Sequence, residues 1–216
     1  MSSREVWGSL LGAACLLSPL PALAQETPPA SYNAPPEVTR GPELPSGYGS
    51  EISLGGGVMN YSGSAARGLT NVGGSWNLRL AFGTRSIVGL EAAYLGTAQK
   101  ISAPGLDPDA NLISNGVESD LRINAPFVSN TGVVEPFVLG GVGWAHYDVI
   151  NDRYNTSLVR ESDDQLTVPV GGGIAASYLG FMFDARFTYR FAFNEQLLGN
   201  ADMGNWIVAA NIGREF

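Results

Sequence analysis

Residues 181–191 read FMFDARFTYRF, a stretch with one apolar face and one charged face. The first face holds Phe181, Phe183, Ala185, Phe187, Tyr189 and Phe191, and the second holds Met182, Asp184, Arg186, Thr188 and Arg190. A repeat of two residues is typical of a β-strand. The alternation alone does not say which face points inward, so the rest of the chain has to decide it.

Seven further runs repeat this pattern, and long connections alternate with short ones between them. The eight runs cover residues 48–61, 74–82, 87–96, 116–125, 134–149, 166–178, 181–193 and 205–216. The long connections are 62–73, 97–113, 150–165 and 194–204, and the tight ones are 83–86 and 179–180, while 126–133 is a longer turn. Most runs are long enough for a tilted strand to cross a bilayer. The sequence predicts an all-β fold over residues 48–216, an eight-stranded antiparallel up-and-down transmembrane β-barrel.

The ends of the runs and the charges within them favour lipid on the outside. Aromatic residues gather near both ends, with Tyr61, Trp76, Tyr94, Tyr147, Phe193 and Trp206 toward the long loops and Tyr48, Phe82, Phe127, Phe137, Tyr178, Phe181 and Phe216 toward the turns. Two aromatic girdles are typical of a barrel that crosses a membrane. A soluble lipocalin-like carrier, with its apolar face inward, is the alternative.

Charges of both signs lie in the middle of the runs, where they would face the lumen. The predicted lumen network consists of Arg79, Glu91, Glu118, Asp120, Arg122, Asp184, Arg186 and Arg190. An eight-stranded interior is just wide enough for side chains to fill it, which favours a plugged barrel. The alternative is a narrow pore for ions or small solutes, lined by the same charges.

The first 47 residues differ from the rest in composition. Arg4 precedes an apolar run over residues 6–23 that ends in Ala22-Leu23-Ala24, which predicts a signal peptide over 1–24 and export of the protein. The only cysteine, Cys15, lies inside it. Residues 25–47 carry six prolines and are predicted to form a periplasmic leader. A net charge of −8 argues against nucleic-acid binding.

Three stretches carry a resemblance to a known group: PFVLGGVGW at 136–144, FDARFTYRF at 183–191, and a last strand that ends in Phe216. The chain resembles the small outer-membrane β-barrels of the OmpA and OmpX type. The resemblance implies the outer membrane of a Gram-negative-type bacterium, contact with its lipids and lipopolysaccharide, and a monomer. It also implies that the barrel-assembly machinery reads Ile212 and Phe216. Arg214 departs from the pattern, which favours an apolar or aromatic residue there.

The sequence offers little chemistry, and we expect no catalytic residue, cofactor or metal. His146, the only histidine, is the one catalytic candidate. Lipid A deacylases of the outer membrane place a serine two residues after such a histidine, but this chain has Asp148 there. The runs Gly55–Gly57 and Gly171–Gly173 lack the lysine of a phosphate loop and are read as bulges or bends. The prediction is a structural or surface-interaction protein in adhesion or envelope integrity, not an enzyme. A pore is the alternative and a hydrolase comes after it.

Overall fold

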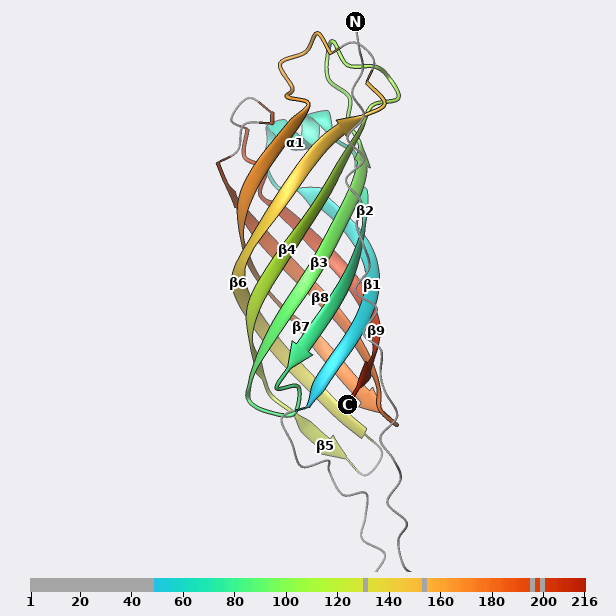
Figure 1. Ribbon diagram of the computed structural model, residues 1–216, viewed down its shortest axis with the longest axis vertical. Coiled ribbons are helices and arrows are strands. Elements are labelled where there is room, and N and C mark those ends of the chain that lie inside the picture. The colour runs from blue at the N-terminus through green and yellow to red at the C-terminus, as the bar shows by residue number, and fades with distance from the viewer. Residues whose placement is uncertain (1–48, 130–131, 153–154, 195–196, 199–200) are drawn as a thin grey trace, which may run out of the picture. The chain divides into compact units, whose positions relative to one another are not determined.

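A computed structural model describes residues 49–129, 132–152, 155–194, 197–198 and 201–216. The predicted signal peptide and proline-rich leader lie outside these residues. The strands are β1 (Ser50–Tyr61), β2 (Gly73–Phe82), β3 (Val88–Lys100), β4 (Asn111–Asn124), β5 (Phe127–Ser129), β6 (Gly132–Ile150), β7 (Ser162–Tyr178), β8 (Phe181–Phe193) and β9 (Asn205–Glu215), with one short helix α1 (Ser64–Leu69) (Figure 1). No helix in the described ranges is long and apolar enough to cross a membrane.

Eight of these strands form a closed antiparallel barrel, as predicted. Each of β1–β4 and β6–β9 pairs with its neighbour, and β1 pairs with β9 to close the wall (Figure 1). When the cross-strand pairs are followed once around the barrel from Ser50 of β1, they lead back to β1 at Asn60. The strands are therefore staggered by ten residues over one circuit. With this stagger, eight strands tilt by about 40° from the barrel axis.

The strands differ from the predicted runs mainly at the long-loop end. β3 continues to Lys100 and β4 begins at Asn111, where the sequence indicated a loop. The inward side chains Thr97 and Ser114 share a hydrogen bond of 2.7 Å there. The backbone pairing thus continues in a region where the sequence no longer alternates clearly between apolar and polar residues. At the other end, β5 lies in the predicted turn 126–133 and pairs with the start of β6 outside the barrel wall. The short helix α1 was not predicted.

The outer surface of the wall is apolar on every barrel strand. Its half-exposed side chains include Leu54, Leu78, Leu90, Leu121, Val138, Ile174, Phe187 and Val208. A continuous apolar band of this kind marks a surface that does not face water, so the apolar face points outward to lipid. Trp76, Tyr94 and Phe193 lie on this surface toward the long loops, and Phe82, Phe181 and Phe216 toward the turns.

The prediction of the girdles was wrong for three aromatic residues. Tyr61, Phe137 and Tyr147 are at most 4% exposed and point into the barrel. Each stands at an inward position of its strand, and the ring of Phe137 lies against Gly173, whose missing side chain leaves room for it. Position near a strand end does not by itself identify a girdle residue.

Candidate functional site

All eight residues predicted for the lumen network point into the barrel. Each of them is at most 7% exposed, so none of these charges has bulk water as its main partner. They come from β2, β3, β4 and β8. Buried ions are stable only when other charges and hydrogen bonds replace water, and their contacts are therefore the first thing to establish.

Glu91 of β3 is the centre of the larger group. It accepts hydrogen bonds from Arg79 of β2 and from Arg186 of β8, which reaches it across the lumen. Its second oxygen lies 3.8 Å from Nη1 of Arg122. Three guanidinium groups thus surround one carboxylate and tie β2, β4 and β8 together through β3.

Neighbours two positions away on the same strand orient these arginines. Nε of Arg79 donates to Asn77 (3.0 Å), and Nε of Arg122 donates to Asn124 (2.6 Å). Nε of Arg186 donates to Asp184 (3.0 Å), whose carboxylate also accepts a hydrogen bond from Asn211 of β9 (2.6 Å). A repeat of two puts donor and acceptor on the same face. Asn77, Asn124 and Asn211 were not predicted as network members.

Glu135 and Phe137 of β6 were also missed. Nη2 of Arg122 donates to Glu135 at 2.8 Å. The guanidinium carbon of Arg122 lies 3.8 Å from the ring centroid of Phe137, and that of Arg186 lies 5.1 Å from it. Phe137 therefore offers its ring to two cations. Glu135, Phe137 and Leu139 occupy alternate positions of their run, and this alternation was the sequence pattern that could have placed them on one face of the strand.

A second ion pair lies apart from the Glu91 group, and one predicted residue joins neither. Arg190 of β8 donates from Nε and Nη2 to both oxygens of Glu118 on β4. Neither oxygen of Asp120 has a hydrogen-bond partner in the described structure, although Asp120 is only 1% exposed. The structure thus brings seven of the eight predicted residues into ionic contact.

Glycine residues on the inward faces of β6 and β7 provide the volume for this network. A Cβ atom at Gly173 would stand 2.9 Å from Cζ of Phe137, and one at Gly141 would stand 2.4 Å from Oδ1 of Asp120. The ladders pass through Gly55–Gly57 and Gly171–Gly173 without an inserted residue, so these runs are not bulges, and their interpretation as bends stays a prediction.

The long loops close the mouth of the barrel with apolar side chains. We call this group the apolar cap: Ala66, Ile101, Val159 and Leu197, one from each long loop, packed with Met59, Tyr61, Leu112, Tyr147 and Met203. Backbone hydrogen bonds join the loops, from Thr156 to Gly105 and from Arg160 to Leu197 (both 3.0 Å). The interior is therefore closed at two levels. Ion pairs fill the lumen between the strands, and the apolar cap closes the barrel at its long-loop end.

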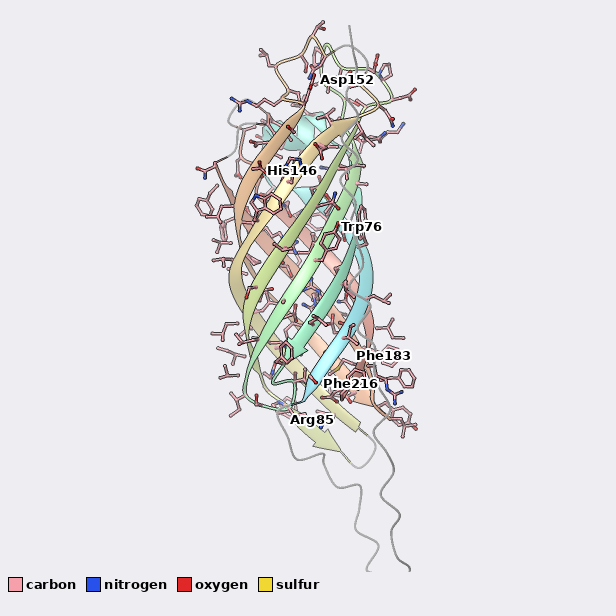
Figure 2. All side chains as sticks on the ribbon, in the orientation of Figure 1. Trp76, Arg85, His146, Asp152, Phe183 and Phe216 are labelled. Atoms are coloured by element: carbon pink, nitrogen blue, oxygen red, sulfur yellow. The ribbon has the colours of Figure 1, made fainter. Side chains whose placement is uncertain are left out.

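His146 lies on the outer surface of β6, beyond the apolar band (Figure 2). Nδ1 lies 2.9 Å from Oδ1 of Asp164, and Nε2 lies 3.3 Å from Oδ1 of Asp148. A catalytic histidine needs a nucleophile within hydrogen-bond reach. Both ring nitrogens here face carboxylates instead, which gives no support to the hydrolase alternative.

The comparisons with known proteins find a similar fold but no similar sequence. No protein-family model matches the chain, and no curated protein matches it significantly. Neisserial surface protein A is similar in structure, with a TM-score of 0.55 and 15% identity over 77% of this chain and 97% of its own. The N-terminal barrel domain of OprF from Pseudomonas aeruginosa has a TM-score of 0.51 and 15% identity over 78% and 98%.

The chain has the fold of the small eight-stranded outer-membrane barrels. The outer membrane enzyme PagL matches more loosely, with a TM-score of 0.41 and 10% identity over 76% of this chain and 98% of its own. Likeness at this level says nothing about activity, since one fold hosts many functions.

Ile212 and Phe216 lie on the outer face of this barrel, at 48% and 69% exposure. Arg214 stands between them on the same face, with its guanidinium carbon 5.2 Å from the ring centroid of Phe181. The cation thus lies over an aromatic neighbour and leaves the apolar side chains open. The role of Ile212 and Phe216 in assembly stays a prediction.

The barrel's acidic residues form no metal centre in the part of the chain that the structure describes. There, no group of three or more histidine, cysteine, aspartate or glutamate side chains is arranged to hold a metal ion.

Proposed function

We propose that this protein is a non-conducting, non-enzymatic barrel of a Gram-negative outer membrane, with its loop end serving as a contact surface. The observation that carries the proposal is the double closure of the interior. A pore needs a continuous polar path through the barrel. Here the Glu91 group fills the lumen between the strands, and the fully buried side chains of Leu197 and Ile101 block the path above it. A closed interior leaves the outer surfaces as the places of function.

Two features support the location and the immediate surroundings. The apolar band fits hydrocarbon, and the similar structures are outer-membrane proteins. In this proposal the barrel is a monomer that contacts outer-membrane lipids and lipopolysaccharide. The exposed Ile212 and Phe216 support recognition by the barrel-assembly machinery, because an apolar terminal face is open to a partner.

The contact surface itself is polar and mainly acidic. A groove of about 900 Å³ between the loops is lined by Lys100, Asp107, Pro108, Asp109, Asn111, Asn151 and Asp152. Among the described residues that line the groove, three carboxylates against one ammonium favour neutral or cationic partner surfaces over polyanions. Loop contacts hold this groove in one shape, since the backbone N–H of Asp107 donates to Asp152 at 3.2 Å.

Conductance of the folded protein in planar bilayers tests the proposal. Folding is first verified by a heat-dependent shift in gel mobility, so that an absence of conductance cannot result from misfolding. We expect no unitary steps at neutral pH. Removal of the apolar cap alone, by Leu197→Asp, should also leave the protein silent because the Glu91 group still fills the lumen. Discrete steps in the unmodified protein would overturn the proposal and favour a pore.

A further inference from the structure

The only histidine of the chain stands between two carboxylates at the base of a long loop. Asp148 lies two positions along β6 from His146, and Asp164 is its cross-strand partner on β7. Figure 2 shows His146 where β6 approaches the loops. Just beyond this point the two strands lead into the loop whose described residues are 151–152 and 155–161, part of the proposed contact surface.

The geometry determines which form of the ring fits. A neutral imidazole carries one N–H, so only one of its nitrogens can donate a hydrogen bond. Here both nitrogens face carboxylate oxygens, at 2.9 Å and 3.3 Å. Only the imidazolium, with two N–H groups, satisfies both contacts. The hydrogen bond with Asp164, followed by the charge of Asp148, raises the pKa of His146 above its ordinary value.

The other neighbours of the ring do not alter this charge balance. On β4, the cross-strand partner is Asn115, which is neutral and accepts a hydrogen bond of 2.8 Å from the hydroxyl of Tyr94 on β3. On β6 itself, Trp144 stacks with the ring at a centroid distance of 6.2 Å. Among the described residues, the charged groups in contact with His146 are therefore the two aspartates.

The loop above these residues is held by contacts that cross to other loops. Thr156 donates to Gly105, Arg160 donates to Leu197, and Asp152 accepts from Asp107. Because the loop connects the end of β6 to the start of β7, these contacts depend on the two strands staying side by side at the rim of the barrel. A deprotonated ring would leave two aspartates with one shared N–H donor at that point.

We propose that His146, Asp148 and Asp164 form a proton-dependent clasp that holds residues 155–161, which lead into β7, in their place. Protonation closes the clasp through a charge-assisted hydrogen bond to Asp164, which joins β6 to β7, and an ion pair with Asp148 within β6. Because the pKa is raised, the added order is complete at pH values below the ordinary pKa of histidine and is lost as pH rises through the pKa of the folded protein. The clasp regulates the proposed contact surface. Its biological role rests on the proposed function, whereas its existence rests on the geometry alone.

Two measurements on the folded protein in micelles test the clasp. The first follows the C2 proton of His146 by NMR as a function of pH, where a single histidine removes any doubt of assignment. We expect the midpoint to fall in Asp164→Asn and, by less, in Asp148→Asn. Equal midpoints in all three proteins would overturn the clasp.

The second measurement compares tryptic cleavage at Arg160 in the loop with cleavage at Arg67, an exposed residue of α1 that serves as internal reference. The ratio should rise about two- to fivefold across the titration, the range of an exposed ion pair, and should not change with pH in His146→Gln. A ratio that responds to pH equally in both proteins would contradict the proposal. Conductance by a protein with an intact clasp would overturn the proposed function alone.

Discussion

At the scale of single residues, Leu179 shows a side chain in a backbone conformation that does not suit it. Tyr178 pairs with Phe181, so β7 and β8 are joined by a two-residue turn. Leu179 and Gly180 both have positive φ, 51° and 79°. Such turns match the twist of a hairpin but favour Asn-Gly, because a larger side chain clashes with its own backbone in this region. The sequence predicted the turn; the strain at Leu179 is visible only in its dihedral angle.

We expect Leu179→Asn to raise the free energy of unfolding by about 1 kcal/mol, since asparagine tolerates this conformation better than leucine. Urea unfolding in lipid vesicles measures it. Leu158→Asn is the matched control, because Leu158 is 94% exposed and does not have a positive φ. A similar change in both variants would show that exposure, not backbone strain, is responsible.

At the scale of elements, β6 shows how two adjacent glycines can have opposite roles. Gly140 faces outward, and its nearest obstacle to a Cβ atom is the carbonyl oxygen of Pro169 at 3.7 Å. Gly141 faces inward, where a Cβ atom would stand 2.1 Å from the carbonyl oxygen of Ser119 and 2.4 Å from Oδ1 of Asp120. Only the second glycine is required by packing.

Gly141→Ala should therefore lower the free energy of unfolding by about 1–3 kcal/mol, the usual range for overpacking. Gly140→Ala, on the same strand and next in sequence, should be neutral or slightly stabilising because alanine restricts the unfolded chain. Parallel urea titrations of the two variants provide the comparison. Equal losses would mean that glycine is needed for strand curvature and not for interior volume.

The strands could be predicted from sequence to different degrees, for physical reasons. Alternation of Phe and Arg identified β8 at its observed bounds, because both of its faces are chemically distinct. The alternation is weak in β3 beyond Gly96, where Ala98 faces outward and Thr97 and Gln99 face inward, so the extension to Lys100 was missed. The cap was missed entirely, since Leu197 and Ile101 lie in loops, where no period indicates burial.

At the scale of the whole molecule, the ion pairs connect strands that are far apart in the sequence. Arg186 is the residue that contacts both Glu91, across the lumen, and Asp184 on its own strand. Its partners were identifiable from sequence only as charges of opposite sign on inward faces. Which carboxylate meets which guanidinium depends on the stagger of the barrel, and the sequence does not show it.

Arg186→Met should lower the free energy of unfolding by about 3–5 kcal/mol, because it leaves the buried carboxylate of Asp184 without its cation and removes one of the three cations around Glu91. Refolding yield in micelles and urea unfolding both measure the loss. Adding Asp184→Asn should recover part of it by removing one uncompensated charge. Arg67→Met, at an exposed residue of α1, is the control and should change stability by less than about 0.5 kcal/mol. Unchanged stability of Arg186→Met would contradict a structural network.

The seam between β1 and β9 has a kinetic consequence. The backbone of Ser50 exchanges hydrogen bonds with that of Phe216, at 2.8 and 3.2 Å, so residues from opposite ends of the barrel sequence must meet to complete the wall. Contacts of such long sequence separation form late, because their loop-closure entropy is large. Until they form, the nascent sheet has two unpaired edges, each able to bind a second chain. The risk of aggregation is thus concentrated in the interval before closure, and a factor that paired with one edge during that interval would leave only the other edge open.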